Sequence, residues 1–366
     1  MTELLTGLKI IDLSLWQPGH VATQLLADLG ADVLKVEPPG GDRERVLTDR
    51  VANYYGHKRS LVLDLKQCEQ RARLIELVRE ADVVVEGYRP GGAERLGVGY
   101  DVLAAVNPGL VYCSISGFGQ TGPLSRSTGH EHNYQAYAGM YVKVREDLPP
   151  VPSGALVANQ GAGMAAAFAI LAAVHCSRRT GRGEHIDIAM ADLLVSWVAP
   201  MGAIGESAAR PRHQENPGMG VYSTGDGGHI VLGIFTETHF WRTLCRSLGL
   251  ERIAEIDFAD RVTRAVELRA ALQTSFASRS RDELVAELDA LGVPIAPVLT
   301  REEALNHPHF RERSVIAHGP EGDRRVGHPI RYRHHPARPP GPIPAVGQGG
   351  ETGFPSARPG IVHRAN

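Results

Sequence analysis

Hydrophobic and polar positions in the first third of the chain follow two alternating patterns. Short runs rich in valine, isoleucine and leucine, typical of buried strands, are separated by stretches in which apolar residues recur at helical spacing. The predicted strands are residues 9–13, 32–37, 60–65, 82–86 and 110–116, and the predicted helices are residues 21–29, 69–79 and 101–106. This alternation predicts an α/β fold built on a parallel sheet.

The same pattern continues to about residue 205. An alanine-rich stretch, residues 163–175, predicts a closely packed helix. Residues 184–189 alternate between apolar and polar side chains as a strand does, and another helix is expected to begin near Met190. We therefore expect one large α/β domain over residues 1–205.

The remaining chain predicts a linker, a smaller domain and a return segment. Residues 206–219 are polar and contain proline, which favours a linker. Residues 220–313 predict an α+β domain with a hairpin, whose strands 220–223 and 229–234 flank a glycine-rich turn, and with helices at 237–248, 264–277 and 281–290. Residues 314–366 are rich in proline and glycine, so we expect an extended return to the large domain and a disordered tip.

Composition and charge exclude several classes of protein. With 366 residues, 43% of them hydrophobic, the chain is long enough for two domains, and its net charge of -2 provides no basic surface for nucleic acid. The four cysteines show no Cys-x-x-Cys spacing, so neither a metal site nor a disulfide framework is expected. Without a signal peptide or an uncharged membrane-spanning stretch, we expect a cytoplasmic protein that contacts no membrane.

Several segments, in the same order along the chain, resemble those of a known family. They are residues 25–38, 58–66, 81–91, 117–123 and 181–187. They resemble the class III CoA-transferase family, also called the CaiB/BaiF family, which includes formyl-CoA transferase, carnitine CoA-transferase and α-methylacyl-CoA racemase. The resemblance implies a Rossmann-like large domain, a smaller α+β domain, an interlocked homodimer, and an acyl-CoA thioester as the substrate, with coenzyme A as the only cofactor.

Coenzyme A carries a 3′-phosphate and a pyrophosphate, so its site needs cations and backbone N–H donors. The resemblance places these contacts on the large domain, where the candidate residues are Lys35, Arg43, Lys58, Arg59 and Arg89. Any one of them alone would more often be a solvated surface cation, but the position within the family motifs favours binding, above all for Arg89 and Lys58. Arg89 also follows a predicted strand end, where open α/β sheets bind their ligands.

Two residues resemble catalytic groups of the family, and a third resembles a substrate contact. His130, in residues 129–134, matches the catalytic histidine of the α-methylacyl-CoA racemases, and Glu237 matches the glutamate that pairs with it. Histidine suits proton transfer at the α-carbon of a thioester because its ordinary pKa lies near neutrality. Without the resemblance, His130 would be read as a partly buried histidine and Glu237 as a helix N-terminal charge. Gln17 matches a glutamine that contacts the acyl end in formyl-CoA transferase-like members.

Asn159 departs from the family pattern. The family usually has an aspartate here, which is the nucleophile of the transferases and one of the two bases of the racemases. A neutral amide can neither attack a thioester nor accept a proton, although it can donate an N–H to a thioester or enolate oxygen. The short segment 216–220 is also a weak counterpart of the glycine-rich loop of the formyl-CoA transferases, which further disfavours a transferase.

Three explanations of Asn159 stay open. The protein catalyses chemistry that needs only one base, His130, as an isomerase, lyase or racemase-like enzyme would. Alternatively, it is a CoA-transferase that uses another carboxylate, with Glu131 the nearest in sequence, or Asn159 was introduced deliberately to trap a ligand. A catalytically silent CoA-binding homologue is a further hypothesis, against which the retained His130 and Glu237 argue.

Overall fold

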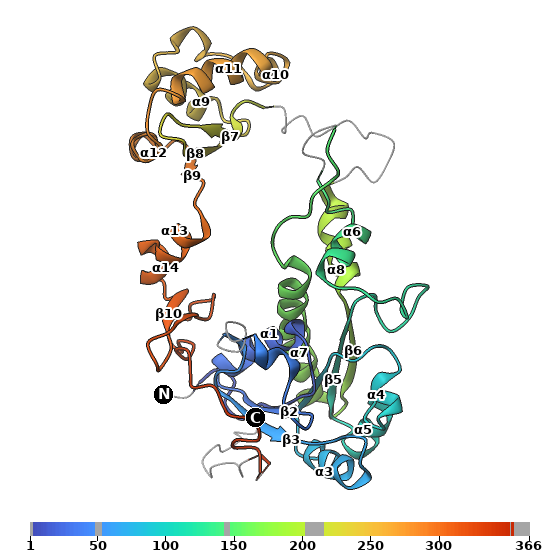
Figure 1. The fold of residues 1–366 in the computed structure, drawn as a ribbon. Helices are drawn as coiled ribbons and strands as arrows, with labels where there is room; N and C mark the ends of the chain where they lie inside the picture. The colour runs from blue at the N-terminus through green and yellow to red at the C-terminus, as the bar shows by residue number, and fades with distance from the viewer. Residues whose placement is uncertain (1–2, 48–52, 143–146, 202–215, 352, 355–366) are drawn as a thin grey trace. The chain divides into compact units, whose positions relative to one another are not determined.

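The computed structural model describes residues 3–47, 53–142, 147–201, 216–351, 353 and 354 (Figure 1). The chain divides into two compact units. The first comprises residues 1–202 and 308–366, and the second comprises residues 203–307. Most of the expected linker, 206–219, and most of the expected C-terminal tip lie outside the described residues.

The first unit is built on a six-stranded sheet in the order β3-β2-β1-β4-β5-β6. Every neighbouring pair of strands is parallel. The strands are β1 (Lys9–Asp12), β2 (Asp32–Glu37), β3 (Lys58–Val62), β4 (Val83–Glu86), β5 (Val111–Ser116) and β6 (Glu184–Ala189). This is the strand order of doubly wound dinucleotide-binding sheets, in which ligands bind beyond the carboxyl ends of the strands where the order reverses, here between β1 and β4. The predicted α/β class is confirmed.

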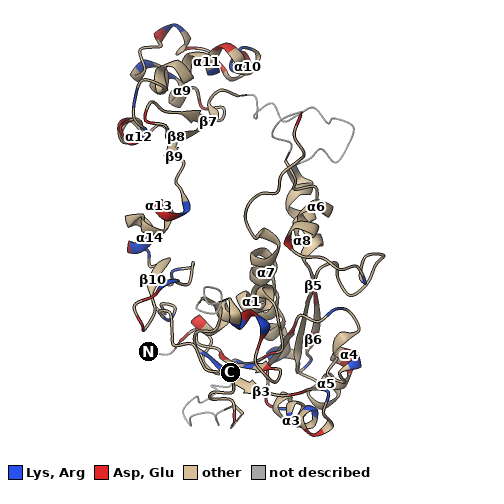
Figure 2. Ribbon diagram, viewed as in Figure 1, with Lys and Arg blue, Asp and Glu red and all other residues tan. Residues whose placement is uncertain are grey.

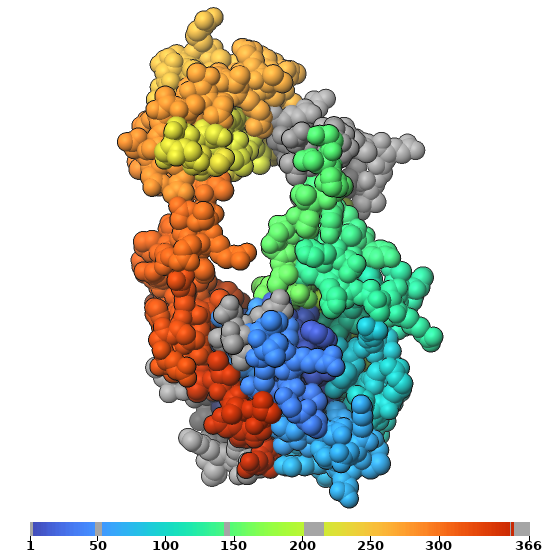
Figure 3. All heavy atoms as spheres, in the orientation of Figure 1, coloured from blue at the N-terminus to red at the C-terminus, as the bar shows by residue number. Residues whose placement is uncertain are grey.

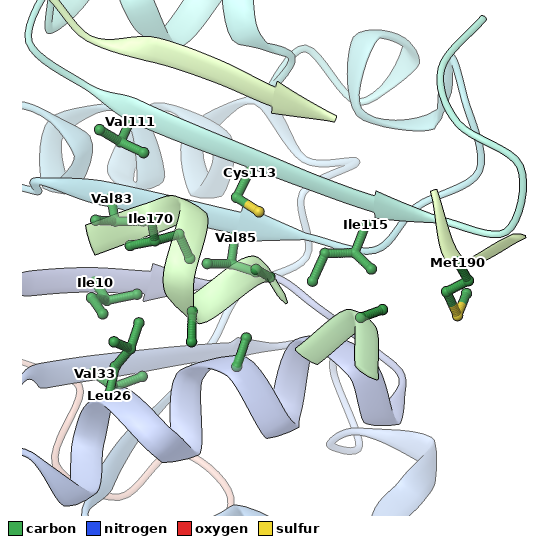
Figure 4. Packing of buried hydrophobic residues seen from close by; sticks show 14 of the residues in the cluster. Ile10, Leu26, Val33, Val83, Val85, Val111, Cys113, Ile115, Ile170 and Met190 are labelled. Carbon is green, nitrogen blue, oxygen red and sulfur yellow. The ribbon is translucent and has the colours of Figure 1, made fainter. Parts of the chain in front are cut away.

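Helices cover both faces of this sheet. The helical segments of this unit up to residue 201 are α1 (Gln17–Asp28), η1 (Arg43–Val46), α3 (Cys68–Val78), α4 (Gly92–Arg95), α5 (Tyr100–Val106), α6 (Glu131–Tyr137), α7 (Val157–Thr180), α8 (Met190–Val198) and η2 (Ala199–Met201). On one face, residues of α1 and α7 such as Leu26 and Ile170 pack on Val33, Val83 and Val111 (Figure 4). On the other face, α3 and α5 bury Leu74, Val78 and Leu103. Strands β1, β2, β4 and β5 place side chains in both cores, which fixes their register.

Helices α1 and α7 pack unusually closely because small residues face α1. Ala158, Ala162 and Ala166 are fully buried. A Cβ atom on Gly163 would lie 2.5 Å from the Val21 side chain and 2.8 Å from the carbonyl oxygen of Pro18, so only glycine fits there. Among the described helices, α7 alone is long and apolar enough to cross a membrane. One side of this helix packs against α1 and the sheet.

The second unit has a three-stranded sheet in the order β7-β8-β9, formed by β7 (Met219–Ser223), β8 (His229–Gly233) and β9 (Ile295–Pro297). Its helices are α9 (Thr238–Ser247), η4 (Glu251–Ile253), α10 (Phe258–Thr263), α11 (Ala265–Phe276), α12 (Arg281–Ala290) and α13 (Arg301–Asn306). The antiparallel pairing of β7 with β8 confirms the predicted hairpin. Trp241, Leu268 and Phe276 are at the centre of its core.

The return segment contains more structure than its composition predicts. After α14 (Pro308–Glu312), strands β10 (Ile316–His318) and β11 (Arg324–Val326) form an antiparallel pair. Farther on, the carbonyl oxygen of Gln348 accepts a hydrogen bond from the N–H of Ser60 at 2.9 Å, and Gly349 pairs with Ser60. The segment therefore extends the edge of the sheet beside β3.

Candidate functional site

The candidate site lies where α1, α6 and α7 begin. Helix α1 starts directly after β1, with Trp16 as its N-cap and Pro18 in its first turn, where the missing N–H of proline is tolerated. Helix α6 starts after His130, whose N–H donates to Asn133 Oδ1 at 3.0 Å. The rings of Trp16 and His130 meet edge to face, with centroids 6.2 Å apart. His130 is exposed, so its imidazole is accessible to a ligand and to solvent protons.

Glu131 holds the start of α7 in place. Its Oε1 accepts hydrogen bonds from Gln135 Nε2 and the N–H of Ala158, both at 2.8 Å, and its Oε2 accepts from the N–H of Asn159 at 2.9 Å. The side chain is only 5% exposed. A carboxylate at a helix N-terminus is stabilised by the unpaired N–H groups and the helix dipole. Glu131, which directly follows His130 in the sequence, therefore connects the start of α6 to the first turn of α7.

Asn159 lies half-buried in the first turn of α7. Its backbone N–H is held by Glu131, and no hydrogen bond of its side chain involves another described residue. The amide can thus donate to a ligand oxygen. Because it is a neutral amide, it can act neither as a nucleophile nor as a base.

Gln17 is buried at the start of α1, and its Nε2 donates to Tyr54 Oη at 3.0 Å. Gln160, which follows Asn159 in α7, donates from its Nε2 to the same oxygen at 2.7 Å. These three side chains form an amide–phenol cluster beside Trp16 and Asn159. Sequence reasoning identified Gln17 but missed Tyr54 and Gln160, because nothing in the local pattern brings the three residues together.

Lys35 of β2 and Lys58 of β3 direct their ammonium groups into the interior, toward Asp12 at the end of β1. Lys35 Nζ is 3.4 Å from Asp12 Oδ1, and Lys58 Nζ is 3.3 Å from Asp12 Oδ2. Lys58 also donates to Thr23 Oγ1 at 2.7 Å. Both side chains are fully buried, so the structure gives these ammonium groups protein partners in place of the expected phosphate.

The buried charges shift one another's protonation. Burial alone would raise the pKa of Asp12, but the two lysines hold it well below its usual range. Burial lowers the pKa of Lys58 to about 8 despite the attraction of Asp12. Burial and the charge of Lys35 lower the pKa of His20 to about 4, so this imidazole is neutral at neutral pH beside Asp42. The network fixes the first turn of α1, which carries Gln17.

The three arginines predicted to contact coenzyme A differ in their availability. Arg59 donates to Asp32 Oδ1 through two nitrogens, at 3.0 and 2.8 Å, and also to the carbonyl oxygen of Gly349. Arg43 and Arg89 are exposed, and neither makes a hydrogen bond or ion pair with the described residues. Arg89 follows β4, at the point of reversal in the strand order. Acidic and basic residues are otherwise interspersed along the ribbon of both units (Figure 2).

Glu237 lies in the second unit as the N-cap of α9. Its Oε2 accepts a hydrogen bond from the N–H of Phe235 at 2.8 Å. The preceding carbonyl, that of Thr236, accepts from the buried guanidinium of Arg261 at 3.0 Å. These contacts fix the turn that carries Glu237, whereas its pairing with His130 stays a prediction.

Glu86, at the end of β4, is a titratable group that sequence reasoning passed over. It is 3% exposed, and its Oε2 accepts from the N–H of Tyr88 at 2.6 Å. Burial raises its pKa to about 7. A carboxylate at the end of an otherwise apolar strand was the available signal. Among the described residues, no three histidine, cysteine or acidic side chains gather as a metal site would require.

The chain is similar to known proteins in sequence and in structure. The family model described as "CoA-transferase family III" matches residues 5–349. Succinate–glutarate CoA-transferase of Agrobacterium fabrum is 34% identical over 337 residues, covering 85% of this chain and 84% of that protein. Human α-methylacyl-CoA racemase is 32% identical over 334 residues, covering 87% and 84%. The crystal structure of a CaiB/BaiF family protein from Brucella suis matches with a TM-score of 0.84 and 30% identity, covering 95% and 97%.

Proposed function

The chain belongs to CoA-transferase family III, and we propose that within it the protein moves a proton at the α-carbon of an acyl-CoA thioester. His130 is the acid/base in this proposal. Relatives include both CoA-transferases and a racemase, so the family alone supports either chemistry. The observation that carries the proposal is an exposed His130 at the start of α6, next to Glu131, whose Oε2 accepts from the N–H of Asn159 in the first turn of α7. In this proposal His130 is the only base, and Asn159 is taken to stand where the family's nucleophile is expected.

The proposed reaction assigns a role to each residue. His130 Nδ1 or Nε2 takes the α-proton, and the C–H electron pair moves into the thioester to form an enolate. The amide N–H of Asn159 donates to the oxygen on which this charge develops, as oxyanion-hole donors do. Glu237 is the proposed partner that orients His130 and stabilises its protonated form. The protonated His130 then returns a proton to the α-carbon, which gives racemase-like exchange. In a chain with a β,γ-double bond it protonates the γ-carbon of the dienolate instead, which gives isomerisation. In a β-hydroxyacyl chain it protonates the β-hydroxyl group, which leaves as water in an elimination.

Coenzyme A is the part of the substrate that the first unit is proposed to hold. Arg89 and Arg43 are exposed and unpaired among the described residues, so their guanidinium groups are available to phosphate. The N-terminus of α1 adds unpaired N–H groups at the same end of the sheet. Lys35, Lys58 and Arg59 are assigned to the support of this region, because each is held by a carboxylate of the protein.

A second copy of the chain is the proposed protein partner. Met164 and Phe168 on α7 are 53% and 76% exposed, and Val195 and Trp197 on α8 are 46% and 45% exposed. Figure 3 shows the part of the chain that contains these helices, in green, reaching the surface. An exposed group of large apolar side chains marks an interaction site. Sedimentation should therefore give a dimer, which Phe168→Glu should weaken.

A CoA-transferase is the second candidate, favoured by the transferases among the relatives. It requires a carboxylate that attacks the thioester. Glu131 is the nearest one to Asn159, but its two oxygens accept three N–H groups of the protein. An attack by Glu131 would break the cap of α7, so we favour proton transfer.

Deuterium uptake into acyl-CoA thioesters in heavy water, followed by mass spectrometry, tests the proposal. The wild-type chain should incorporate deuterium at the α-carbon, and His130→Ala should abolish this uptake. His132→Ala is the matched control, because it removes an exposed histidine two positions away. Transfer of CoA between carboxylic acids without deuterium uptake would support the CoA-transferase hypothesis. CoA binding without either reaction would identify a catalytically silent homologue.

A further inference from the structure

Tyr54 occupies an unusual hydrogen-bonding position in the amide–phenol cluster. Its Oη accepts from Gln17 Nε2 at 3.0 Å and from Gln160 Nε2 at 2.7 Å. A phenol has one hydrogen to donate and two lone pairs to accept with. Both acceptor positions are taken, and no described residue accepts the hydrogen of Tyr54.

Two features indicate that the protein alone leaves this cluster incomplete. The residue Gln17 is 4% exposed, and its Oε1 has no hydrogen-bond partner among the described residues. Buried polar atoms are nearly always paired, so an unpaired one calls for an explanation. Tyr54 is half-buried, so its free hydroxyl hydrogen lies where a ligand can reach the residue. A phenol oxygen that accepts two hydrogen bonds is polarised and becomes a stronger donor.

The cluster is adjacent to the proposed chemistry along both helices. Gln17 follows Trp16, whose ring contacts His130. Gln160 follows Asn159, whose amide is proposed to bind the thioester oxygen. Because Asn159 is proposed to donate to the thioester oxygen, we expect the hydroxyl group of Tyr54 to contact another part of the acyl group.

We propose that Tyr54 is a specificity-determining residue that donates a hydrogen bond to an oxygen on the acyl chain, beyond the thioester. This inference rests on the proposed function, because it assumes an acyl-CoA ligand at the start of α1 and α7. The substrate class is then an acyl-CoA whose chain carries a carboxylate or a hydroxyl group. A purely hydrocarbon acyl chain would leave the hydroxyl of Tyr54 without an acceptor.

Calorimetric titration of wild type and Tyr54→Phe with succinyl-CoA, butanoyl-CoA and free CoA tests this proposal. Succinyl-CoA and butanoyl-CoA have the same chain but end in a carboxylate and a methyl group. Loss of one hydrogen bond to a charged oxygen should weaken succinyl-CoA binding by about 10- to 100-fold. Binding of butanoyl-CoA and free CoA should change less than about twofold. A third probe, 4-hydroxybutanoyl-CoA, shows whether a hydroxyl group is bound in place of the carboxylate, and a selective loss with either oxygen supports the proposal.

Two further variants serve as a control and as an independent test of the cluster. Tyr100→Phe removes a hydroxyl on α5, over the opposite core of the sheet, and should bind every thioester as wild type does. Gln160→Leu removes one of the two donors to Tyr54 and should weaken succinyl-CoA binding in the same selective way, by less. If Tyr54→Phe fails to fold, Gln160→Leu still tests the proposal.

Three outcomes would overturn the proposal. They are equal losses with succinyl-CoA and butanoyl-CoA, no loss in Tyr54→Phe, and a wild-type chain that prefers butanoyl-CoA over both oxygen-bearing thioesters. Because these titrations measure binding and not turnover, they are independent of deuterium uptake. Selective binding without deuterium uptake would refute the proposed reaction and keep the role of Tyr54.

Discussion

Replacement of Glu131 by glutamine tests whether this residue is a structural cap or a nucleophile. Glutamine has nearly the same shape, but one of its two ends carries N–H groups in place of an acceptor. In the wild-type chain, Oε1 accepts from Gln135 and Ala158, and Oε2 accepts from Asn159. In Glu131→Gln, at least one backbone N–H of α7 would therefore face another donor inside the protein.

The expected loss of stability follows from these contacts. A hydrogen bond to a charged group contributes about 1.5–3 kcal/mol, and a negative charge at a helix N-terminus adds about 0.3–2 kcal/mol. We expect Glu131→Gln to lower the free energy of unfolding by about 2–4 kcal/mol, which corresponds to roughly 4–7 °C in Tm for a unit of this size. Proton exchange should also fall, because the first turn of α7 places Asn159.

Thermal and urea unfolding, with deuterium uptake measured on the same samples, would check this prediction. Glu76→Gln is the control, because the Glu76 side chain is 68% exposed and pairs only with Arg79 among the described residues. Its unfolding should change by less than about 0.5 kcal/mol. If Glu131→Gln is as stable as the control, Glu131 does not act as a structural cap of α7. An acyl adduct on Glu131 that mass spectrometry detects in the wild type would identify it as the nucleophile.

Three further predictions concern the first unit. Burial gives Glu86 a folded pKa of about 7 against an ordinary 4.5, so its contribution to stability is present below pH 4.5 and lost as the pH rises through 7. Between pH 5 and 8, urea titration should show wild type losing about 3 kcal/mol relative to Glu86→Gln, and parallel curves would contradict this. Gly163→Ala should destabilise the chain by about 1–3 kcal/mol in thermal unfolding, since its Cβ would lie 2.5 Å from Val21. Arg89→Ala should weaken CoA binding by about tenfold in calorimetry with unchanged Tm, and equal affinity would remove Arg89 from the site.

The strands could be predicted from sequence because short runs of β-branched and other apolar residues mark most of them, and β6 alternates between apolar and polar side chains. Strand β3 shows the limit of this reasoning. It was predicted at residues 60–65 and is observed at Lys58–Val62. The pattern excluded Lys58 as a charged residue, whereas its ammonium group is buried on Asp12, 46 positions away in the sequence. A pairing over that distance leaves no local signal.

The start of α1 was predicted too late for a different reason. The helix begins at Gln17, whereas the prediction began at residue 21, because Pro18 and Gly19 are typical of a loop. Proline is tolerated in the first helical turn, where its missing N–H has no partner to lose. The short helix α6 and the hairpin of β10 and β11 were missed as well, since so few residues carry no clear periodicity.

Within the candidate site, the sequence could identify residue types but not their neighbours. His130 and Asn159 were found through the family motifs, and the structure adds that Glu131 connects their segments. Glu131 was considered as a nucleophile because it was the nearest candidate carboxylate in the sequence, and its three bonded N–H donors became visible only in the fold. Tyr54 is separated from Gln160 by 106 positions, so its place between two amides could not be predicted.

The stereochemistry of α-carbon exchange is the most direct test of one-base chemistry. A single enantiomer of a 2-methylacyl-CoA thioester in heavy water would be followed for deuterium uptake and for racemisation in the same samples. With His130 as the only base on one face, the wild-type chain should incorporate deuterium and retain the configuration, and Asn159→Asp should add racemisation. Racemisation by the wild-type chain at the rate of uptake, or uptake that survives in His130→Ala, would contradict the one-base mechanism.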